Sequence, residues 1–202
     1  MKEREVMKKS PAPIRGKHIT LKPLTLKDFD VYYESGFQQE DPEVLRLTGT
    51  KAGVTREQLK SYVVRIVNAE DRVDFLLWNE EGRLVGEAVL NEIDEEVRRA
   101  NFRIAFFQEK DFGKGYGSEA TALTVDYGFT ELHLHRIELE VFSINPRAKR
   151  AYEKAGFQLE GCLRDAEIID GAYCDVLLMA MLEEDYERKK IKEIQAKNSV
   201  TV

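Results

Sequence analysis

The sequence is short of the features that mark membrane, secreted and metal-binding proteins. Its 202 residues contain 2 cysteines and 3 histidines, too few and too badly spaced for a disulfide framework or a zinc site, so no metal is predicted. No stretch approaches the ~20 apolar residues of a membrane span, and the charged N-terminal segment lacks the apolar run of a secretory signal. The sequence therefore predicts a protein of the reducing cytoplasm with no membrane contact.

Basic residues are in the minority as well. Lys and Arg number 31 against 37 Asp and Glu, which gives a net charge of -6. A negative field repels polyanions, so nucleic acid is not an expected partner, and the same field attracts cationic substrates. The remaining composition, 43% hydrophobic and 34% charged, is typical of one folded domain.

The chain divides into a leader, a domain and a tail. Residues 1–17 contain Pro11 and Pro13 and no periodic apolar face, so a flexible leader is expected there. The folded domain is expected over residues 18–183. Residues 184–202 are rich in charge, and we expect a dispensable tail with one or two turns of helix.

Apolar periodicity predicts about seven strands in the domain. They are expected over residues 19–24, 73–79, 84–93, 97–107, 136–142, 157–168 and 173–182. Helices are expected after the capping residues Thr25 and Thr55, after the glycines near residue 115, and from Asn145 to Gly156. Hairpin-type connections in the middle of the chain favour an α/β (α+β) domain with a mixed, mostly antiparallel sheet and helices on both faces.

The most informative segment is a glycine-rich loop that runs directly into a helix. Glycines at the alternate positions 113, 115 and 117 remove side chains that would hold a ligand away from the backbone. The N–H groups and the positive end of the helix dipole can then converge on an anion, for which a pyrophosphate is the natural candidate. The residues expected to bind it are Gly113, Lys114, Gly115, Tyr116, Gly117 and Ser118.

Spacing separates the known classes of pyrophosphate loop. A Walker loop needs Lys-Ser or Lys-Thr after its second glycine, but Lys114 stands between the glycines, so that class is excluded. The dinucleotide fingerprint needs a glycine where Ser118 stands, which leaves an NAD-type dehydrogenase as a minor alternative. A glycine turn without a ligand is the other alternative, although glycines are costly to order.

A second segment begins about thirty residues after the loop. It has the pattern Asn-x-x-Ala-x-x-x-Tyr-x-x-x-Gly-Phe, from Asn145 to Phe157. Together with the Gly-x-Gly-x-Gly loop, it resembles the GCN5-related N-acetyltransferases (GNAT), especially the bacterial branch that acetylates ribosomal-protein alanine and spermidine. The resemblance covers residues 18–182 and implies a single GNAT-like domain that uses acetyl-CoA as acyl donor.

The resemblance also implies how the donor is held. The glycine loop matches the family's pyrophosphate loop, except that Phe112 replaces a Gln or Arg and removes one polar contact. A bulged strand, whose backbone pairs with the pantetheine arm and polarises the thioester carbonyl, matches Ile104, Ala105 and Phe106. Asn145 matches the residue that binds a pantetheine amide.

Two further positions follow from the resemblance. Lys149 is expected to reach the phosphates of the nucleotide end. Tyr152 matches the tyrosine beside the thioester sulfur, and a phenol of pKa about 10 stays protonated at neutral pH, so Tyr152 is the expected general acid. The alternative is a core tyrosine that packs beside Ala148.

The base that takes the proton of the amine is less specified. Glu87 and Glu140 are candidates by their position on strands, and the alternative for each is a solvated strand carboxylate. The predicted reaction is direct attack by a primary amine, from a protein N-terminus, a polyamine or another small amine. A non-catalytic acetyl-CoA sensor is the alternative function, and a homodimer is an expected assembly in this family.

Overall fold

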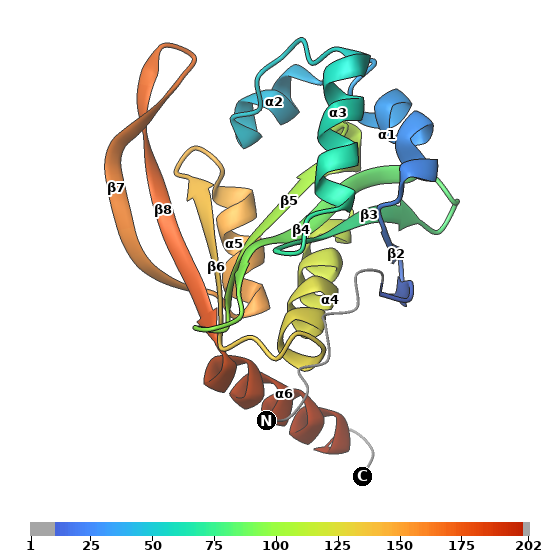
Figure 1. The fold of residues 1–202 in the computed structure, drawn as a ribbon. Coiled ribbons are helices and arrows are strands. Elements are labelled where there is room, and N and C mark those ends of the chain that lie inside the picture. The colour runs from blue at the N-terminus through green and yellow to red at the C-terminus, as the bar shows by residue number, and fades with distance from the viewer. Residues whose placement is uncertain (1–10, 200–202) are drawn as a thin grey trace.

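A computed structural model describes residues 11–199, which form an eight-stranded sheet with helices on both faces (Figure 1). The strand order is β1-β2-β3-β4-β5-β6-β8-β7, and every neighbouring pair is antiparallel except β5 with β6. The predicted mixed, mostly antiparallel sheet is confirmed, with β1 as an additional strand. The strands are β1 (Ile14–Arg15), β2 (Ile19–Pro23), β3 (Val73–Asn79), β4 (Leu84–Asp94), β5 (Arg99–Phe106), β6 (Arg136–Phe142), β7 (Gln158–Ile169) and β8 (Ala172–Leu182).

Capping residues define the helix ends. Thr55 and Gln58 exchange the predicted capping-box hydrogen bonds, and the Asn145 side chain accepts the N–H of Ala148 at 3.1 Å. Among the described helices, none combines the length and hydropathy of a membrane span. The helices are α1 (Phe29–Gly36), α2 (Pro42–Thr48), α3 (Arg56–Val67), α4 (Tyr116–Thr130), α5 (Pro146–Ala155) and α6 (Glu183–Ser199).

The N-terminal segment carries more structure than the sequence indicated. Residues 1–10 of the predicted leader lie outside the described residues, whereas Ile14–Arg15 pairs with β2. The Glu119 carboxylate on α4 accepts the backbone N–H groups of Lys17 and His18. A flexible leader up to residue 17 is therefore wrong for residues 14–17, because contacts to a strand and a helix far along the chain hold them.

The C-terminal segment is a helix of 17 residues in place of the predicted turn or two. Tyr186 of α6 stacks on Phe129 of α4 with ring centroids 4.8 Å apart, and its hydroxyl donates to Asp126 at 2.5 Å. Lys190 forms an ion pair with the same carboxylate. Packing on α4 explains the length of α6, and the charge pattern alone does not reveal it.

Two apolar clusters pack on opposite faces of the sheet. Alternate residues of β3 show the arrangement, since Phe75 and Leu77 belong to the cluster under α4 and α5, whereas Leu76 belongs to the cluster under α1 and α3. Both faces of the central strands are thus buried. The packing under α4 and α5 fixes the N-termini of these two helices beside the ends of β5 and β6 (Figure 1).

The sheet opens between its two parallel strands. Strands β5 and β6 pair only over residues 99–101 and 136–138. Beyond that point β5 stays paired with β4 as far as Phe106, and β6 stays paired with β8 as far as Phe142. Residues 102–106 and 139–142 therefore have facing edges without a ladder between them.

Candidate active site

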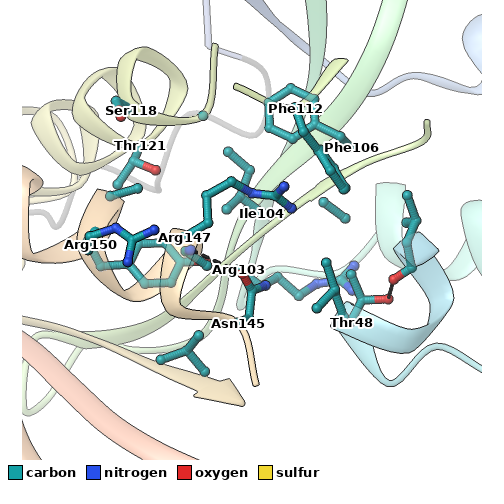
Figure 2. A pocket seen from close by; sticks show the side chains of 18 of the residues that line it. Thr48, Arg103, Ile104, Phe106, Phe112, Ser118, Thr121, Asn145, Arg147 and Arg150 are labelled. Atoms are coloured by element: carbon teal, nitrogen blue, oxygen red, sulfur yellow. Dashed lines mark hydrogen bonds between the residues drawn. The ribbon is translucent and has the colours of Figure 1, made fainter. Parts of the chain in front are cut away.

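A cavity of about 500 Å³ lies where β5 and β6 diverge (Figure 2). Its walls come from β5, the glycine loop, the first turns of α4, the end of β6, α5 and, on the far side, α2. Most of the predicted site residues meet here, although they come from segments far apart in the sequence. Those lining the cavity are Glu87, Ile104, Ala105, Phe106, Gly113, Gly115, Gly117, Ser118, Glu140, Asn145 and Tyr152.

The strand wall of the cavity is regular. Ile104, Ala105 and Phe106 pair in unbroken register with Ala88, Glu87 and Gly86 of β4, and the irregularity between these strands lies at residues 91–94. The predicted bulge at residues 104–106 is therefore wrong. Divergence of β6 exposes this backbone edge to the cavity instead.

The glycine loop presents unused backbone donors. Gly113 and Gly115 have φ values of 74° and 84°, and a Cβ at either position would have open space around it. Among the described residues, the N–H groups of positions 113–118 have no hydrogen-bond acceptor, whereas the next N–H, of Glu119, already bonds to the Gly115 carbonyl at 3.1 Å. Six donors at a helix N-terminus are free for an anion.

Lys114 and Tyr116 are not among the residues that line the cavity. Lys114 Nζ lies 3.0 Å from the buried Asp111 carboxylate, which also accepts two bonds from Arg83 at 2.6 and 2.8 Å. Burial would raise the pKa of Asp111, but the hydrogen bonds from Arg83 and Lys114 lower it. Tyr116 packs in the core. In this arrangement the Lys114 side chain is engaged by Asp111 and that of Tyr116 by the core, and both residues keep unbonded backbone N–H groups.

Phe112, the departure from the family pattern, lies against a cation from another element. The guanidinium of Arg147 on α5 sits 3.9 Å from the centre of the Phe112 ring. Arg150 and Lys154 line the same wall, whereas Lys149 pairs with Glu153 and is not part of the lining. Figure 2 shows Arg147 and Arg150 on the α5 side of the cavity, beside α4.

Helical spacing is the signal that would have found these residues. Positions 147, 150 and 154 follow each other at intervals of three and four on α5, so they share one face, and position 149 lies off it. Thr121 was also missed, although it follows Gly117 and Ser118 by one turn on α4 and lines the cavity.

Tyr152 is both a core residue and a wall of the cavity. It is 7% exposed and packs edge-on against Phe102 and Phe157, with ring centroids 6.2 and 6.0 Å away. Burial raises the pKa of Tyr152 to about 12. The phenol therefore carries its proton throughout the physiological range.

Glu87 is not the solvated carboxylate that the sequence left as an alternative. It is 8% exposed, its Oε2 accepts the Tyr32 hydroxyl at 2.6 Å, and its Oε1 lies 3.1 Å from Arg103. Burial and then the Glu87 charge raise the pKa of Tyr32, and the same charge raises the pKa of Arg103. Glu140 is exposed and has no described polar partner.

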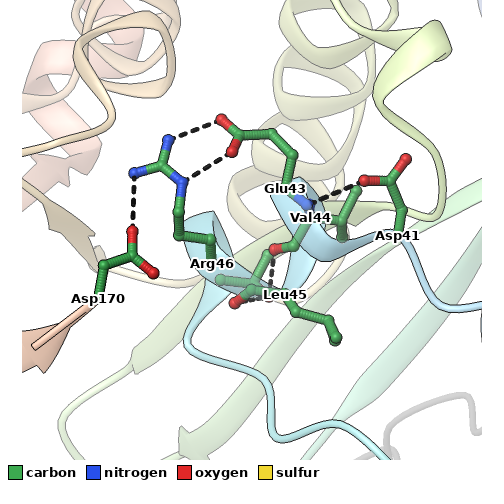
Figure 3. A network of polar contacts seen from close by, with 7 residues as sticks. Asp41, Glu43, Val44, Leu45, Arg46 and Asp170 are labelled. Atoms are coloured by element: carbon green, nitrogen blue, oxygen red, sulfur yellow. Dashed lines mark hydrogen bonds and ion pairs between the residues drawn. The ribbon is translucent and has the colours of Figure 1, made fainter.

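Helix α2 forms the wall opposite α4 and α5, and an ion pair joins it to the β7–β8 turn (Figure 3). Helix α2 was not predicted, although the Asp41 carboxylate caps it by accepting the N–H groups of Glu43 and Val44. Arg46 bonds to Glu43 at 2.7 Å and lies 3.9 Å from Asp170, in the turn between β7 and β8. This contact links α2, which lines the cavity, to the β7–β8 hairpin.

Comparisons with known proteins agree with this geometry. The family model of the acetyltransferase (GNAT) domain matches residues 18–158. N-acetyltransferase p20 of Bacillus licheniformis is 30% identical over 172 residues, covering 83% of this chain and 94% of the relative. The spermidine N(1)-acetyltransferase of Vibrio cholerae is 39% identical over 119 residues, covering 59% and 67%.

A solved structure has the same fold. The Vibrio cholerae spermidine N-acetyltransferase in complex with CoA and spermine has a TM-score of 0.75 and 27% sequence identity, covering 83% of this chain and 97% of that one. The family-model match, residues 18–158, includes β2 at one end and the helix α5, which carries Tyr152, at the other. The chain belongs to the GNAT family of acetyltransferases.

Proposed function

We propose that this chain transfers the acetyl group of acetyl-CoA to a primary amine, with the amine attacking the thioester directly. As a GNAT acetyltransferase the chain uses acetyl-CoA as its donor. The observation that supports the site most is the set of unbonded N–H groups at residues 113–118, of which Gly113, Gly115, Gly117 and Ser118 line the same cavity as the unpaired edge of β5. One ligand with a diphosphate and an amide-bearing arm would use both.

The donor is proposed to lie along the backbone. Its diphosphate would accept hydrogen bonds from the glycine loop at the positive end of α4. Arg147, stacked on Phe112, supplies from α5 a cation in place of the polar side chain that position 112 lacks. The Asn145 oxygen caps α5, which leaves its NH₂ group to donate to a pantetheine carbonyl.

The chemical step then needs a proton balance. The amine nitrogen forms a bond to the thioester carbon, a backbone N–H of β5 stabilises the oxyanion, and the C–S bond breaks as the carbonyl reforms. Tyr152 donates a hydrogen bond and then a proton to the departing sulfur, the amine loses one proton to the base, and solvent carries one proton back to Tyr152, so that no net proton is gained or lost by the protein. A phenol with a pKa of about 12 is a weaker acid than a thiol, so proton transfer from Tyr152 to the thiolate is uphill. The transfer is completed when Tyr152 is reprotonated.

Glu140 is the better of the two candidate bases. Both oxygens of Glu87 are engaged, by Tyr32 and by Arg103, so Glu87 is proposed to position these residues and not to accept the proton. Glu140 lines the cavity and is exposed. A water held by Glu140 would take the proton of the amine.

The acceptor is proposed to be a polyamine. The net charge of -6 attracts a polycation, and a relative named as a spermidine acetyltransferase is 39% identical over 119 residues and has a solved structure of the same fold. The amine would enter beside α2, whose residues Val44, Leu47 and Thr48 line the cavity opposite the glycine loop. A protein N-terminus is the second class of acceptor to be tested.

Release of free thiol from acetyl-CoA tests the proposal. The panel contains spermidine, spermine, peptides with N-terminal alanine and small monoamines, and release is expected with at least one of them. Acetyl-CoA binding without thiol release from any of these amines would contradict catalysis and support a non-catalytic sensor.

Assembly and location are further proposals. Both cysteines, Cys162 and Cys174, are free thiols, which supports a reducing compartment such as the cytoplasm. A homodimer stays a prediction from the family resemblance. Sedimentation velocity at several concentrations measures it directly.

A further inference from the structure

Thr121 carries a buried hydroxyl that nothing in the described chain satisfies. The residue is 1% exposed, and its Oγ1 has no hydrogen-bond partner. Thr124, on the same helix, shows the ordinary solution, because its Oγ1 donates to the Ala120 carbonyl at 2.8 Å. The corresponding carbonyl for Thr121 is that of Gly117, and the Thr121 hydroxyl does not use it. Since a buried hydroxyl without a partner is costly, a missing partner is the natural explanation.

The position of Thr121 indicates what the partner is. Thr121 lines the cavity one helical turn after Gly117 and Ser118, on the face of α4 that continues the glycine loop. Figure 2 shows its side chain on the same wall as Ser118, facing Arg150 and Arg147 of α5. Unbonded N–H groups and the guanidinium groups of Arg147 and Arg150 therefore belong to the same cavity as the hydroxyl, and an anion bound there would accept hydrogen bonds from donors of each kind.

We propose that Thr121 Oγ1 donates a hydrogen bond to a phosphate oxygen of the CoA diphosphate, as a binding residue of the donor site. The inference rests on the proposed function, because it requires CoA in this cavity. The hydroxyl extends the row of donors from the loop into the second turn of α4. The structure thus assigns to donor binding a side chain that the glycine pattern does not include.

Two substitutions separate the hydroxyl from the shape of the side chain. Thr121→Val removes the donor and keeps the branched shape, whereas Thr121→Ser keeps the donor. Titration calorimetry of the full chain with CoA is expected to show a Kd about tenfold to a hundredfold higher for Thr121→Val, the loss of one hydrogen bond to a charged group. Thr121→Ser is expected to stay within about threefold of the unmodified chain.

Thr124→Val is the matched control. It removes a buried hydroxyl three residues further along α4 that does not line the cavity, so CoA affinity should be unchanged. Without CoA, Thr124→Val is expected to lower the Tm because it loses a satisfied hydrogen bond, and Thr121→Val is expected to leave it equal or higher. A structural role would lower the Tm of Thr121→Val and would leave the CoA affinity of Thr121→Ser as low as that of Thr121→Val. This pair of results would overturn the proposal.

Dephospho-CoA, which keeps the diphosphate and lacks the 3′-phosphate, locates the contact. The loss in Thr121→Val should be the same for CoA and dephospho-CoA. A loss seen only with CoA would assign the hydroxyl to the 3′-phosphate, and equal CoA affinity in Thr121→Val would leave it without a role in binding; either result contradicts the proposal. Failure of the unmodified chain to bind CoA would instead remove the proposed function itself.

Discussion

The part of the cavity proposed for the donor presents a run of unbonded backbone groups, whereas the part proposed for the acceptor presents paired side chains. On the donor side, the edge of β5 and the N–H groups of residues 113–118 are unbonded in the described chain. On the acceptor side, Glu87 pairs with Arg103, and Arg46 pairs with Glu43 and Asp170. The proposed donor side thus has backbone hydrogen-bonding groups open for a ligand, whereas the charged side chains of the proposed acceptor side are already paired with one another.

This comparison predicts which substitutions affect chemistry, donor binding, loop stability and acceptor binding.

The largest effect is expected for Tyr152→Phe, with a 10²- to 10⁴-fold lower kcat, because a positioned proton donor contributes a factor of that order. The KM for acetyl-CoA should change little. Steady-state thiol release measures both quantities, and Tyr127→Phe, a buried tyrosine that does not line the cavity, is the control. Equal kcat in Tyr152→Phe would remove the residue from the mechanism.

The raised pKa of Tyr152 adds a pH test. Since its pKa is about 12 in the fold and about 10 in the unfolded chain, the neutral phenol stabilises the fold fully below pH ~10, and this contribution is lost as the pH rises toward 12. Tyr152 also keeps its proton between pH 8 and pH 10. The kcat of the unmodified chain should therefore not show a fall in this range that is absent from Tyr152→Phe. Such a fall would mean that Tyr152 ionises more easily than its burial implies.

The second largest effect concerns the loop. Gly115→Glu should raise the Kd for CoA by about a hundredfold or more, because the side chain would fill and repel the phosphate site. Gly82→Glu is the matched control, since Gly82 also has a positive φ, 76°, and open space, in the turn between β3 and β4. Both variants carry the strain of ~1–2 kcal/mol for a left-handed residue. Equal CoA affinity in the two variants would refute the placement of the diphosphate.

Asp111 tests the support beneath the loop. Asp111→Asn is expected to lower the free energy of unfolding by about 2 kcal/mol, because the bonds from Arg83 and Lys114 lose their charge. The pKa of Asp111 is lowered in the fold, so the contribution is present above pH ~4 and is lost as the pH falls further. Denaturant unfolding at pH 7 and pH 3 measures it. A difference that persists unchanged at pH 3 would contradict the charge as its cause.

The smallest effect is expected on the acceptor side. Arg46→Ala should raise the KM for the amine about two- to fivefold, because α2 loses its link to the β7–β8 turn, and should leave the KM for acetyl-CoA unchanged. Stability should change by less than about 1 kcal/mol. Arg188→Ala, which breaks a surface pair on α6, is the control. A larger change in the KM for acetyl-CoA than in the KM for the amine would contradict the proposed separation of donor and acceptor sides.

The donor side was predictable because its signals are local. Glycines at alternate positions before a helix specify a left-handed, open loop, and Asn145 with Gly156 specifies where α5 begins and ends. These features depend on backbone conformation, which neighbouring residues in the sequence determine. The strand limits from β3 to β6 followed from the period of the apolar residues in the same way.

The rest could not be predicted because it depends on contacts between distant segments. The burial of Glu87 is created by Tyr32 from α1 and Arg103 from β5, and a lone Glu in a strand has the same pattern when it is solvated. The length of α6 depends on the stack of Tyr186 on Phe129. Helix α2 did have a local signal, the Asp41 cap followed by proline, but its seven residues are too short for a periodic face.

Hydrogen–deuterium exchange of the amides at residues 113–118 and 102–106, with and without saturating CoA, tests the central claim most directly. The N–H groups of residues 113–118 have no acceptor in the described chain, and β5 has no partner strand on its cavity edge beyond residue 101. CoA is therefore expected to slow exchange at residues 113–118 and at those amides of residues 102–106 that do not bond to β4, while exchange in the β3–β4 turn stays the same. Bound CoA that leaves the exchange of both segments unchanged would contradict the account.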